Sequence, residues 1–268
     1  MERNEARSSK PPRDWFILAS LLAAAGLVVL FVRARTMRSP STPGKASEFR
    51  GFSLDAIAPF YDPFIHLLGF GAQSRRRSVE LAGIKPGDRV LDVGCGTGEL
   101  TLYEKDAAGP AAYVAGIDVG PRLIEIAKGK ARQTGRAIDF RVASIESLPF
   151  PDGSFDVVTS SLMLHHLPTE TKRTGLAEVY RVLKPGGRIL ILDIGPTTVP
   201  LRLITGPLAR VLSFVPELVY SQDNFEGRVP DFLREAGFAA VQSLAKHRFL
   251  GLSLEVLLAR KPYEMVAQ

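Results

Sequence analysis

The chain is scarce in cysteine and in aromatic residues, and this limits the chemistry open to it. Among its 268 residues there is one cysteine, Cys95, and aromatic residues make up 8%. A single cysteine excludes an intramolecular disulfide framework and a multi-cysteine metal site, and no metal ion is predicted. Arginine and aromatic side chains do not gather into a platform, so nucleic acid is not an expected partner.

The overall composition is that of a globular protein. Apolar residues make up 46% and charged residues 23%, which argues against disorder. The length suits one α/β domain with a short appendage. The net charge of +6 is modest and fits either an anionic membrane surface or simple solubility.

One apolar run is long enough to concern a membrane. Residues 15–32 (WFILASLLAAAGLVVLFV) carry no charge, Trp15 stands at one edge, and Arg33, Arg35 and Arg38 follow. A bilayer needs about 17–25 such residues, so the run predicts a single transmembrane anchor. A buried helix and a cleaved signal peptide are the alternatives. No small-x-small cleavage site follows the run.

The remaining chain divides by composition. Residues 1–14 are a polar tail. Residues 33–50 are a linker, since 39–47 are rich in serine, proline and glycine. A folded domain is expected over residues 51–262, followed by a tail over 263–268. No internal repeat is evident.

Within this domain, short apolar strands alternate with helices. Strands are predicted over 89–93, 113–118, 140–143, 155–160, 188–193, 240–245 and 251–260. Helices are predicted after Pro121, over 169–183 and over 230–236, and Lys184-Pro185-Gly186-Gly187 ends the second of these. The pattern predicts an α/β fold: a Rossmann-like, doubly wound, mostly parallel seven-stranded sheet with helices on both faces. Ligands of such sheets bind beyond the carboxyl ends of the strands.

A glycine loop follows the first strand. In Asp92-Val93-Gly94-Cys95-Gly96-Thr97-Gly98, the glycines let the backbone approach a ligand closely, but they do not separate a dinucleotide from S-adenosylmethionine. Asp92 does, because a carboxylate there repels a pyrophosphate and suits a ligand with an ammonium and a sulfonium. Asp118 ends the next strand, where a carboxylate can accept both ribose hydroxyls. The predicted cofactor is S-adenosylmethionine.

Four stretches carry a family resemblance. VLDVGCGTGEL, GIDVGPRLIEIAK, ESLPFPDGSFDVVTSSLMLHHLP and RVLKPGGRILILD resemble successive motifs of class I S-adenosylmethionine-dependent methyltransferases. They are most similar to the ubiquinone/menaquinone-biosynthesis C-methyltransferase type. The resemblance covers roughly residues 55–261.

The resemblance implies a set of donor contacts. The glycine loop would line the methionine part, through Asp92, Gly94, Gly96 and Gly98, with Cys95 between them. Asp118 would hold the ribose, and the adenine would meet Val119, Ser144 and Ile145. Ser160 would face the sulfonium, and Tyr61 would belong to a helical lid. Family members commonly have aspartate where Ser144 stands.

Methyl transfer mainly needs alignment and exclusion of water. A base is required only if the acceptor loses a proton, and His165 and His166 are placed for that after the fourth strand. Packing or capping of the helix near Pro168 is the alternative role. Asp193, at the end of the fifth strand, could orient an acceptor. Arg75, Arg76 and Arg77 are expected to form a solvated helix face or a membrane contact.

The acceptor is less defined than the donor. Residues 196–220 are apolar and proline-spaced, as expected of a cover over an acceptor pocket. Together with the anchor they favour a lipophilic acceptor: a quinone or phenolic ring, or a phospholipid amine. A soluble small molecule, and a donor-binding protein without transferase activity, are the alternatives. Since the donor is cytosolic, the domain is expected on the cytoplasmic side of a single-pass anchor, although charge favours this orientation only weakly. The oligomeric state stays open.

Overall fold

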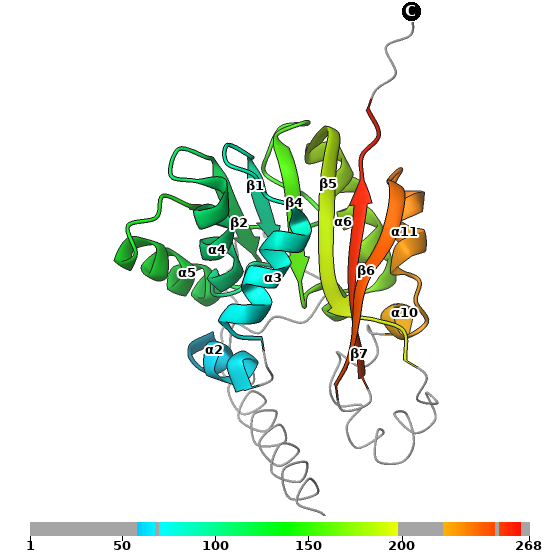
Figure 1. The fold of residues 1–268 in the computed structure, drawn as a ribbon, viewed down its shortest axis with the longest axis horizontal. Helices are drawn as coiled ribbons and strands as arrows, with labels where there is room; N and C mark the ends of the chain where they lie inside the picture. Colours follow the sequence, from blue (N-terminus) through cyan, green and yellow to red (C-terminus); the bar gives the residue numbers. More distant parts are fainter. Residues whose placement is uncertain (1–57, 68–69, 198–221, 250–251, 264–268) are drawn as a thin grey trace, which may run out of the picture. The chain divides into compact units, whose positions relative to one another are not determined.

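The computed structural model describes residues 58–67, 70–197, 222–249 and 252–263. These form a seven-stranded sheet in the order β3-β2-β1-β4-β5-β7-β6 (Figure 1). Among the described strands, β7 alone runs opposite to the common direction of the others, which confirms the predicted mostly parallel sheet. The strands are β1 Val90–Val93, β2 Val114–Asp118, β3 Asp139–Val142, β4 Phe155–Ser161, β5 Leu183–Ile194, β6 Ala239–Phe249 and β7 Leu252–Arg260.

Helices cover both faces of the sheet. Those on one face are α3 Ala72–Ala82, α4 Glu99–Ala108 and α5 Pro121–Gln133; those on the other are α6 Thr169–Val182 and α11 Val229–Glu235 (Figure 1). The remaining elements are α2 Ala58–Leu67, the 3-10 turn η2 Leu164–His166 and α10 Gln222–Phe225. Pro121 occupies the first turn of α5, where its missing N–H costs no hydrogen bond.

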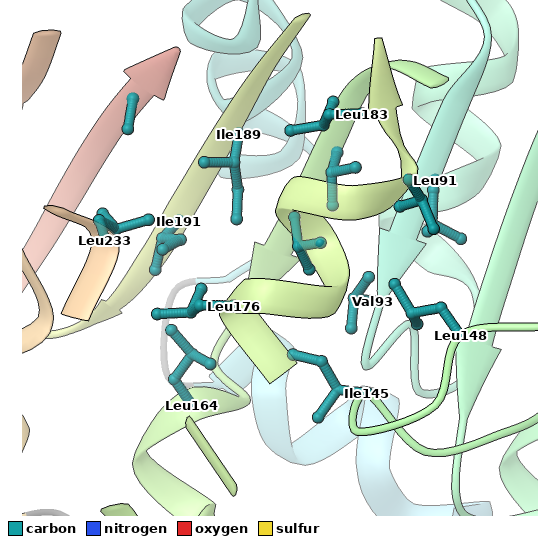
Figure 2. Packing of buried hydrophobic residues seen from close by; sticks show 14 of the residues in the cluster. Leu91, Val93, Ile145, Leu148, Leu164, Leu176, Leu183, Ile189, Ile191 and Leu233 are labelled. Carbon is teal, nitrogen blue, oxygen red and sulfur yellow. The ribbon is translucent and has the colours of Figure 1, made fainter. Parts of the chain in front are cut away.

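The alternation of side chains along β1 divides the core between the two faces. Leu91 and Val93 belong to the same core cluster as Leu176 of α6 and Leu233 of α11 (Figure 2), whereas Val90 packs toward α3 and α4. All four residues of β1 are buried, as expected of a central parallel strand. Each fully buried side chain of this size contributes about 1.5–3 kcal/mol.

Strand β5 begins earlier than the sequence predicts. The helix before it ends at Val182, and Leu183 already pairs with Phe155. The register then shifts between Phe155 and Val157, and Gly186 adopts a φ of 78°. The Lys-Pro-Gly-Gly segment therefore ends the helix as predicted, but it forms an irregular start to the strand rather than a separate loop.

The order of the strands reverses between β1 and β4, which lie side by side in the sheet. At such a switch point the connections leave the strand ends in opposite directions and open a crevice at their carboxyl ends. The glycine loop follows β1 and the histidine pair follows β4, so this crevice is where both meet.

Several of the predicted segments lie outside the described residues. They are the polar tail 1–14, the apolar run 15–32, the linker 33–50, most of the apolar cover 196–220 and all but the first residue of the tail 263–268. Within the part of the chain that the structure describes, no helix has the length and apolar character to cross a membrane.

Candidate active site

The glycine loop wraps around the carboxyl end of β2. Gly94, Gly96 and Gly98 all have positive φ, at 75°, 54° and 77°, a region that side chains with a Cβ rarely adopt. The amides of Gly94 and Cys95 both donate to the carbonyl of Ile117, at 2.8 and 2.9 Å. The loop is thus tied to the neighbouring strand with its concave side toward the crevice.

An open cleft of about 600 Å³ lies against this loop. Its wall combines the ends of β1 and β2, one tyrosine from α2, the chain after β3 and the chain after β4. The lining residues are Tyr61, Val93, Gly94, Gly96, Ile117, Asp118, Val119, Leu123, Ala143, Ile145, Leu162, Met163, His166 and Leu167. Seven of the predicted site residues therefore face one cavity: Tyr61, Gly94, Gly96, Asp118, Val119, Ile145 and His166.

Asp118 sits at the rim of the cleft with its carboxylate held by backbone amides. Gly96 donates to Oδ2 at 3.0 Å and Gly120 donates to Oδ1 at 2.8 Å. A carboxylate oxygen can accept more than one hydrogen bond. This arrangement suits a vicinal diol such as a ribose.

The side of the cleft where the adenine is expected is apolar, with Val119, Leu123 and Ile145 along it. Two predicted contacts lie elsewhere. Ser144 accepts a hydrogen bond from the amide of Glu146 at 3.2 Å, so its hydroxyl belongs to a turn and does not line the cleft. Ser160 is 4% exposed and lies within the sheet, one residue short of the strand end.

Gly98 and Cys95 support the loop from behind the cleft. A Cβ at Gly98 would lie 2.7 Å from Phe140 Cζ and 2.9 Å from the Cβ of Ala127. Cys95 packs in the same cluster with Phe140 and Ala127. The third glycine of the loop therefore permits close packing of the loop against β3 and α5, and it does not line the cleft.

A second, smaller cavity of about 340 Å³ continues beneath the loop. Asp92, Arg75 and Glu99 bring charge to it. Burial raises the pKa of Asp92 to about 6, although the hydrogen bond from Thr101 and the charge of Arg75 oppose the rise. A carboxylate beside a guanidinium in one small cavity suits a zwitterion, such as the amino-acid end of S-adenosylmethionine.

Arg75 corrects an expectation from the sequence. Its side chain is only 12% exposed and donates to Glu99 Oε2 at 3.0 Å, so it does not belong to a solvated helix face. Arg77, by contrast, is 64% exposed. Three consecutive arginines gave no local signal of which one points inward, because that depends on how α3 packs against α4.

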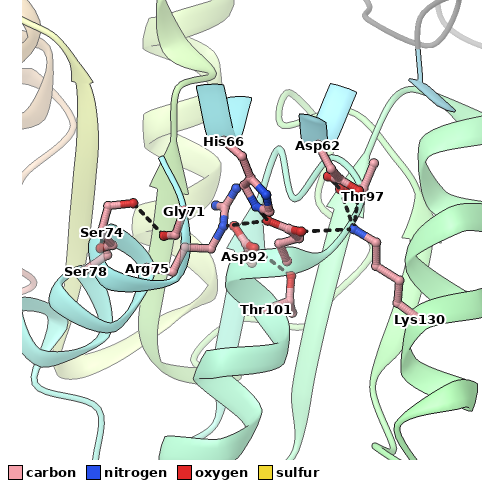
Figure 3. A network of polar contacts seen from close by, with 11 residues as sticks. Asp62, His66, Gly71, Ser74, Arg75, Ser78, Asp92, Thr97, Thr101 and Lys130 are labelled. Atoms are coloured by element: carbon pink, nitrogen blue, oxygen red, sulfur yellow. Dashed lines mark hydrogen bonds and ion pairs between the residues drawn. The ribbon is translucent and has the colours of Figure 1, made fainter. Parts of the chain in front are cut away.

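Polar contacts hold helix α2 against the glycine loop and against helices α4 and α5 (Figure 3). Asp62 pairs with Lys130 of α5 at 2.6 Å and accepts a hydrogen bond from Thr97. His66 lies 2.8 Å from Glu99 at the start of α4. These contacts, which the sequence did not reveal, hold α2 so that Tyr61 reaches the cleft.

Tyr61 covers the glycine loop. A Cβ on Gly96 would stand 3.5 Å from the ring carbon Cε1 of Tyr61, which is an ordinary van der Waals contact, so the ring lies close over the loop and it is the φ of 54° that favours glycine here. Burial raises the pKa of Tyr61 to about 12, and the negative charges of Asp118 and Asp62 add to the rise. The phenol is therefore neutral and can donate a hydrogen bond into the cleft.

The chain after β4 forms the opposite wall. Leu162 has a φ of 53°, which is unusual for a bulky side chain. Its amide donates to Leu192 at 2.8 Å, so the turn is fixed from the neighbouring strand. The side chain of Met163 packs against Gly94. The strained turn directs Leu162, Met163 and His166 toward the cleft.

His165 and Asp193 are in direct contact. Nδ1 of His165 lies 2.5 Å from Asp193 Oδ1, and the ring centroids of His165 and His166 are 3.9 Å apart. Burial of Asp193 favours its protonated form, but its attraction to His165 prevails and lowers its pKa. Burial and the neighbouring His165 lower the pKa of His166 to about 3. His166, on the cleft wall, is therefore a neutral imidazole.

A separate buried ion pair joins α6 to α10. Lys172 of α6 is 0% exposed and its Nζ lies 3.3 Å from Asp223 of α10. Arg228 and Thr169 also donate to Asp223, at 2.9 and 2.6 Å. These contacts fix α10 against α6, and no sequence pattern indicated them.

Comparison with known proteins agrees with this geometry. Residues 90–187 match the model of a methyltransferase domain family. The chain is 44% identical over 142 residues to the demethylmenaquinone methyltransferase of Thermus thermophilus, covering 52% of this chain and 63% of that one. It is 40% identical over 144 residues to the 2-phytyl-1,4-naphtoquinone methyltransferase of Synechococcus elongatus, covering 52% and 61%. The chain thus spans less than two thirds of these relatives.

Solved structures show the same fold. A methyltransferase from Aquifex aeolicus, described as dependent on S-adenosylmethionine, superposes with a TM-score of 0.54 at 26% identity, over 70% of this chain and 89% of that one. Phosphoethanolamine N-methyltransferase 2 of Haemonchus contortus, solved with S-adenosylhomocysteine, gives 0.59 at 19% identity, over 72% and 53%.

Fold, cleft and comparisons together define a class I methyltransferase whose cofactor is S-adenosylmethionine. Within that class, the chain resembles enzymes named as ubiquinone/menaquinone-biosynthesis C-methyltransferases and demethylmenaquinone methyltransferases over about half of its length.

Proposed function

We propose that this protein transfers the methyl group of S-adenosylmethionine to a ring carbon of a reduced, lipid-tailed quinone. The observation that carries the proposal is the cleft, where diol and zwitterion contacts end at an apolar wall bearing a histidine. The similarity to two enzymes named for naphthoquinone-type acceptors supports the choice of acceptor.

The cleft wall after β4 suits a flat apolar ring. Leu162, Met163 and Leu167 supply apolar surface beside His166. Such a wall excludes water and holds the ring against the donor, which is most of what methyl transfer requires. The donor supplies an activated methyl group on its sulfonium.

In this proposal, the two histidines have different roles in removing a proton from a ring hydroxyl of the acceptor. A ring carbon of a hydroquinone becomes a better nucleophile when a ring hydroxyl loses its proton. His166 is neutral at the cleft wall and can hydrogen-bond that hydroxyl. His165 is paired with Asp193 through Nδ1 and its ring lies beside that of His166, so the Asp193 carboxylate can stabilise positive charge that develops on the histidine pair.

A lipid-tailed acceptor also gives the apolar run 15–32 a purpose. We propose that it anchors the protein as a single span, with the domain on the cytoplasmic side, where the donor is available. The support is the uncharged run itself with its flanking arginines.

The acceptor is tested by supplying purified protein with S-adenosylmethionine and three acceptor pools: demethylated quinols, phospholipid amines and aqueous metabolites. Formation of S-adenosylhomocysteine with a methylated quinol, identified by mass spectrometry, is expected in the first pool alone. Turnover confined to phospholipids or aqueous metabolites would replace the acceptor. Donor binding without turnover in any pool would make the protein a donor-binding module.

Anchoring is tested separately, by fractionating cells that express the full chain or the chain lacking residues 1–38. The full chain should stay with membranes after a high-salt wash, and the shortened chain should not. Release of both by salt would refute the anchor.

A further inference from the structure

Four polar side chains form a buried layer beneath the glycine loop. Asp92 of β1 and Thr159 of β4 are register partners on adjacent strands. Thr101 and Glu104 stand three residues apart on α4, which places them on one helix face. All four are at most 2% exposed. A second buried acid therefore lies close behind the carboxylate that faces the methionine end of the donor.

This layer has fewer donors than two carboxylates need. Thr101 Oγ1 donates to Asp92 Oδ2 at 2.7 Å, and Thr159 Oγ1 donates to Glu104 Oε1 at 2.6 Å. Among the described residues, nothing donates to Asp92 Oδ1 or Glu104 Oε2, and both atoms are buried. Each hydroxyl has one proton to give, and a buried charge without partners is very costly. Two ionised carboxylates do not suit this layer.

The groups around the layer supply little positive charge. Arg75 from α3 brings positive charge and Asp118 from β2 brings negative charge, while Cys95 of the loop and Tyr61 from α2 stay neutral because burial raises the pKa of each. Arg75 is itself shared with Glu99. Burial raises the pKa of Glu104 well above its ordinary value, and the negative charge of Asp92 adds to the rise. Glu104 is thus the member of the pair that keeps a proton.

We propose that Glu104 and Asp92 hold one proton between them in the donor-free protein, and that the ammonium group of the donor expels it on binding. The O–H bond of the protonated carboxyl breaks, the proton passes to solvent, and the two resulting carboxylates are balanced by the ammonium and Arg75. Glu104 is then a positioning residue that acts through Asp92 and makes donor affinity depend on pH. The inference rests on the donor site described above.

The test is calorimetric titration of S-adenosylhomocysteine, which carries the same ammonium, at pH 7.0 in buffers of different ionisation enthalpy. The slope of binding heat against ionisation enthalpy counts the protons released. The full chain should release close to one proton per ligand. Glu104→Gln should release about a tenth of one, since Asp92, with a pKa of about 6, is then largely ionised already.

Two further variants complete the test. Glu125→Gln, an exposed change on α5, should release as many protons as the unaltered protein. Glu104→Asp, which keeps a carboxyl in the layer, should restore much of the release that Glu104→Gln loses. Circular dichroism establishes that each variant is folded.

The outcomes separate this inference from the proposed function. Equal proton release by the unaltered protein and Glu104→Gln, or none by either, overturns the shared proton while leaving the donor site intact. Absence of any binding heat by folded protein overturns the donor site itself.

Discussion

Replacing Asp118 with asparagine removes a charge from the rim of the cleft while keeping the side chain's size. Both carboxylate oxygens already accept backbone amides, from Gly96 at 3.0 Å and from Gly120 at 2.8 Å, so the group is rigidly placed before a ligand arrives. Hydrogen bonds to charged groups contribute about 1.5–3 kcal/mol each. In asparagine, one ribose hydroxyl keeps an acceptor that is no longer charged, and the other hydroxyl loses its acceptor. The binding free energy should therefore weaken by about 2–4 kcal/mol, or about 30- to 1,000-fold in Kd.

The same change affects the loop. The new amide group faces an N–H of Gly96 or Gly120, which leaves one donor unsatisfied at a cost of about 1–3 kcal/mol in stability. Titration calorimetry with S-adenosylhomocysteine measures the affinity, and thermal unfolding measures the stability. Asp231→Asn, whose side chain is 63% exposed, is the matched control and should change neither.

A ligand lacking both ribose hydroxyls distinguishes the two effects. If Asp118 binds the ribose, the 2′,3′-dideoxy analogue should bind the unaltered protein weakly, and Asp118→Asn should weaken it little further. An equal loss of affinity for both ligands would mean that the variant acts by distorting the loop. Unchanged affinity for both would refute the placement of the ribose at Asp118.

Three further predictions follow from the packing and the charges. Gly98→Ala should lower the unfolding free energy by about 3 kcal/mol or more in chemical denaturation, because its Cβ would lie 2.7 Å from Phe140 at a φ of 77°; a stability equal to that of the unaltered protein would refute the packing. Asp193→Asn should lower kcat about 100-fold or more with donor Kd unchanged, since it removes the charge that stabilises a protonated His165; an unaltered pH–rate profile would exclude the dyad. Glu104→Gln should gain stability relative to the unaltered protein as pH rises from 5 to 8. Folding raises the pKa of the Glu104 carboxyl, so the unaltered protein loses about 1.4 kcal/mol of unfolding free energy per pH unit between the unfolded-state and folded-state pKa values. Equal pH dependence of the unfolding free energies of the two proteins would contradict this.

The donor site was predictable from the sequence where it depends on backbone and strand ends. Gly94 and Gly96 take the positive φ that their spacing suggests, and Asp118 ends β2 beside them. Ser144 was not predictable in this way. Its position in the sequence places it just after β3, yet its hydroxyl faces the amide of Glu146. The direction of a side chain in a turn depends on local hydrogen bonding.

For the histidine pair, the sequence indicated which residues to consider, and the structure assigned their contacts. His165, His166 and Asp193 could each be selected from their positions after strands β4 and β5. Their separate roles depend on contacts across the sheet, namely the 2.5 Å approach of His165 to Asp193 and the place of His166 on the cleft wall.

Local sequence patterns were sufficient to predict the strands, the sheet type and the glycine loop beside the cleft. Those features depend on short apolar runs, on glycines at positive φ and on acids at strand ends, all of which are properties of neighbouring residues. Tertiary structure alone decided that Arg75 points inward while Arg77 does not, that Lys130 reaches Asp62, and that Glu104 is buried behind Asp92. Each of these depends on how one helix packs against another element, and packing brings together residues whose spacing along the chain carries no such information.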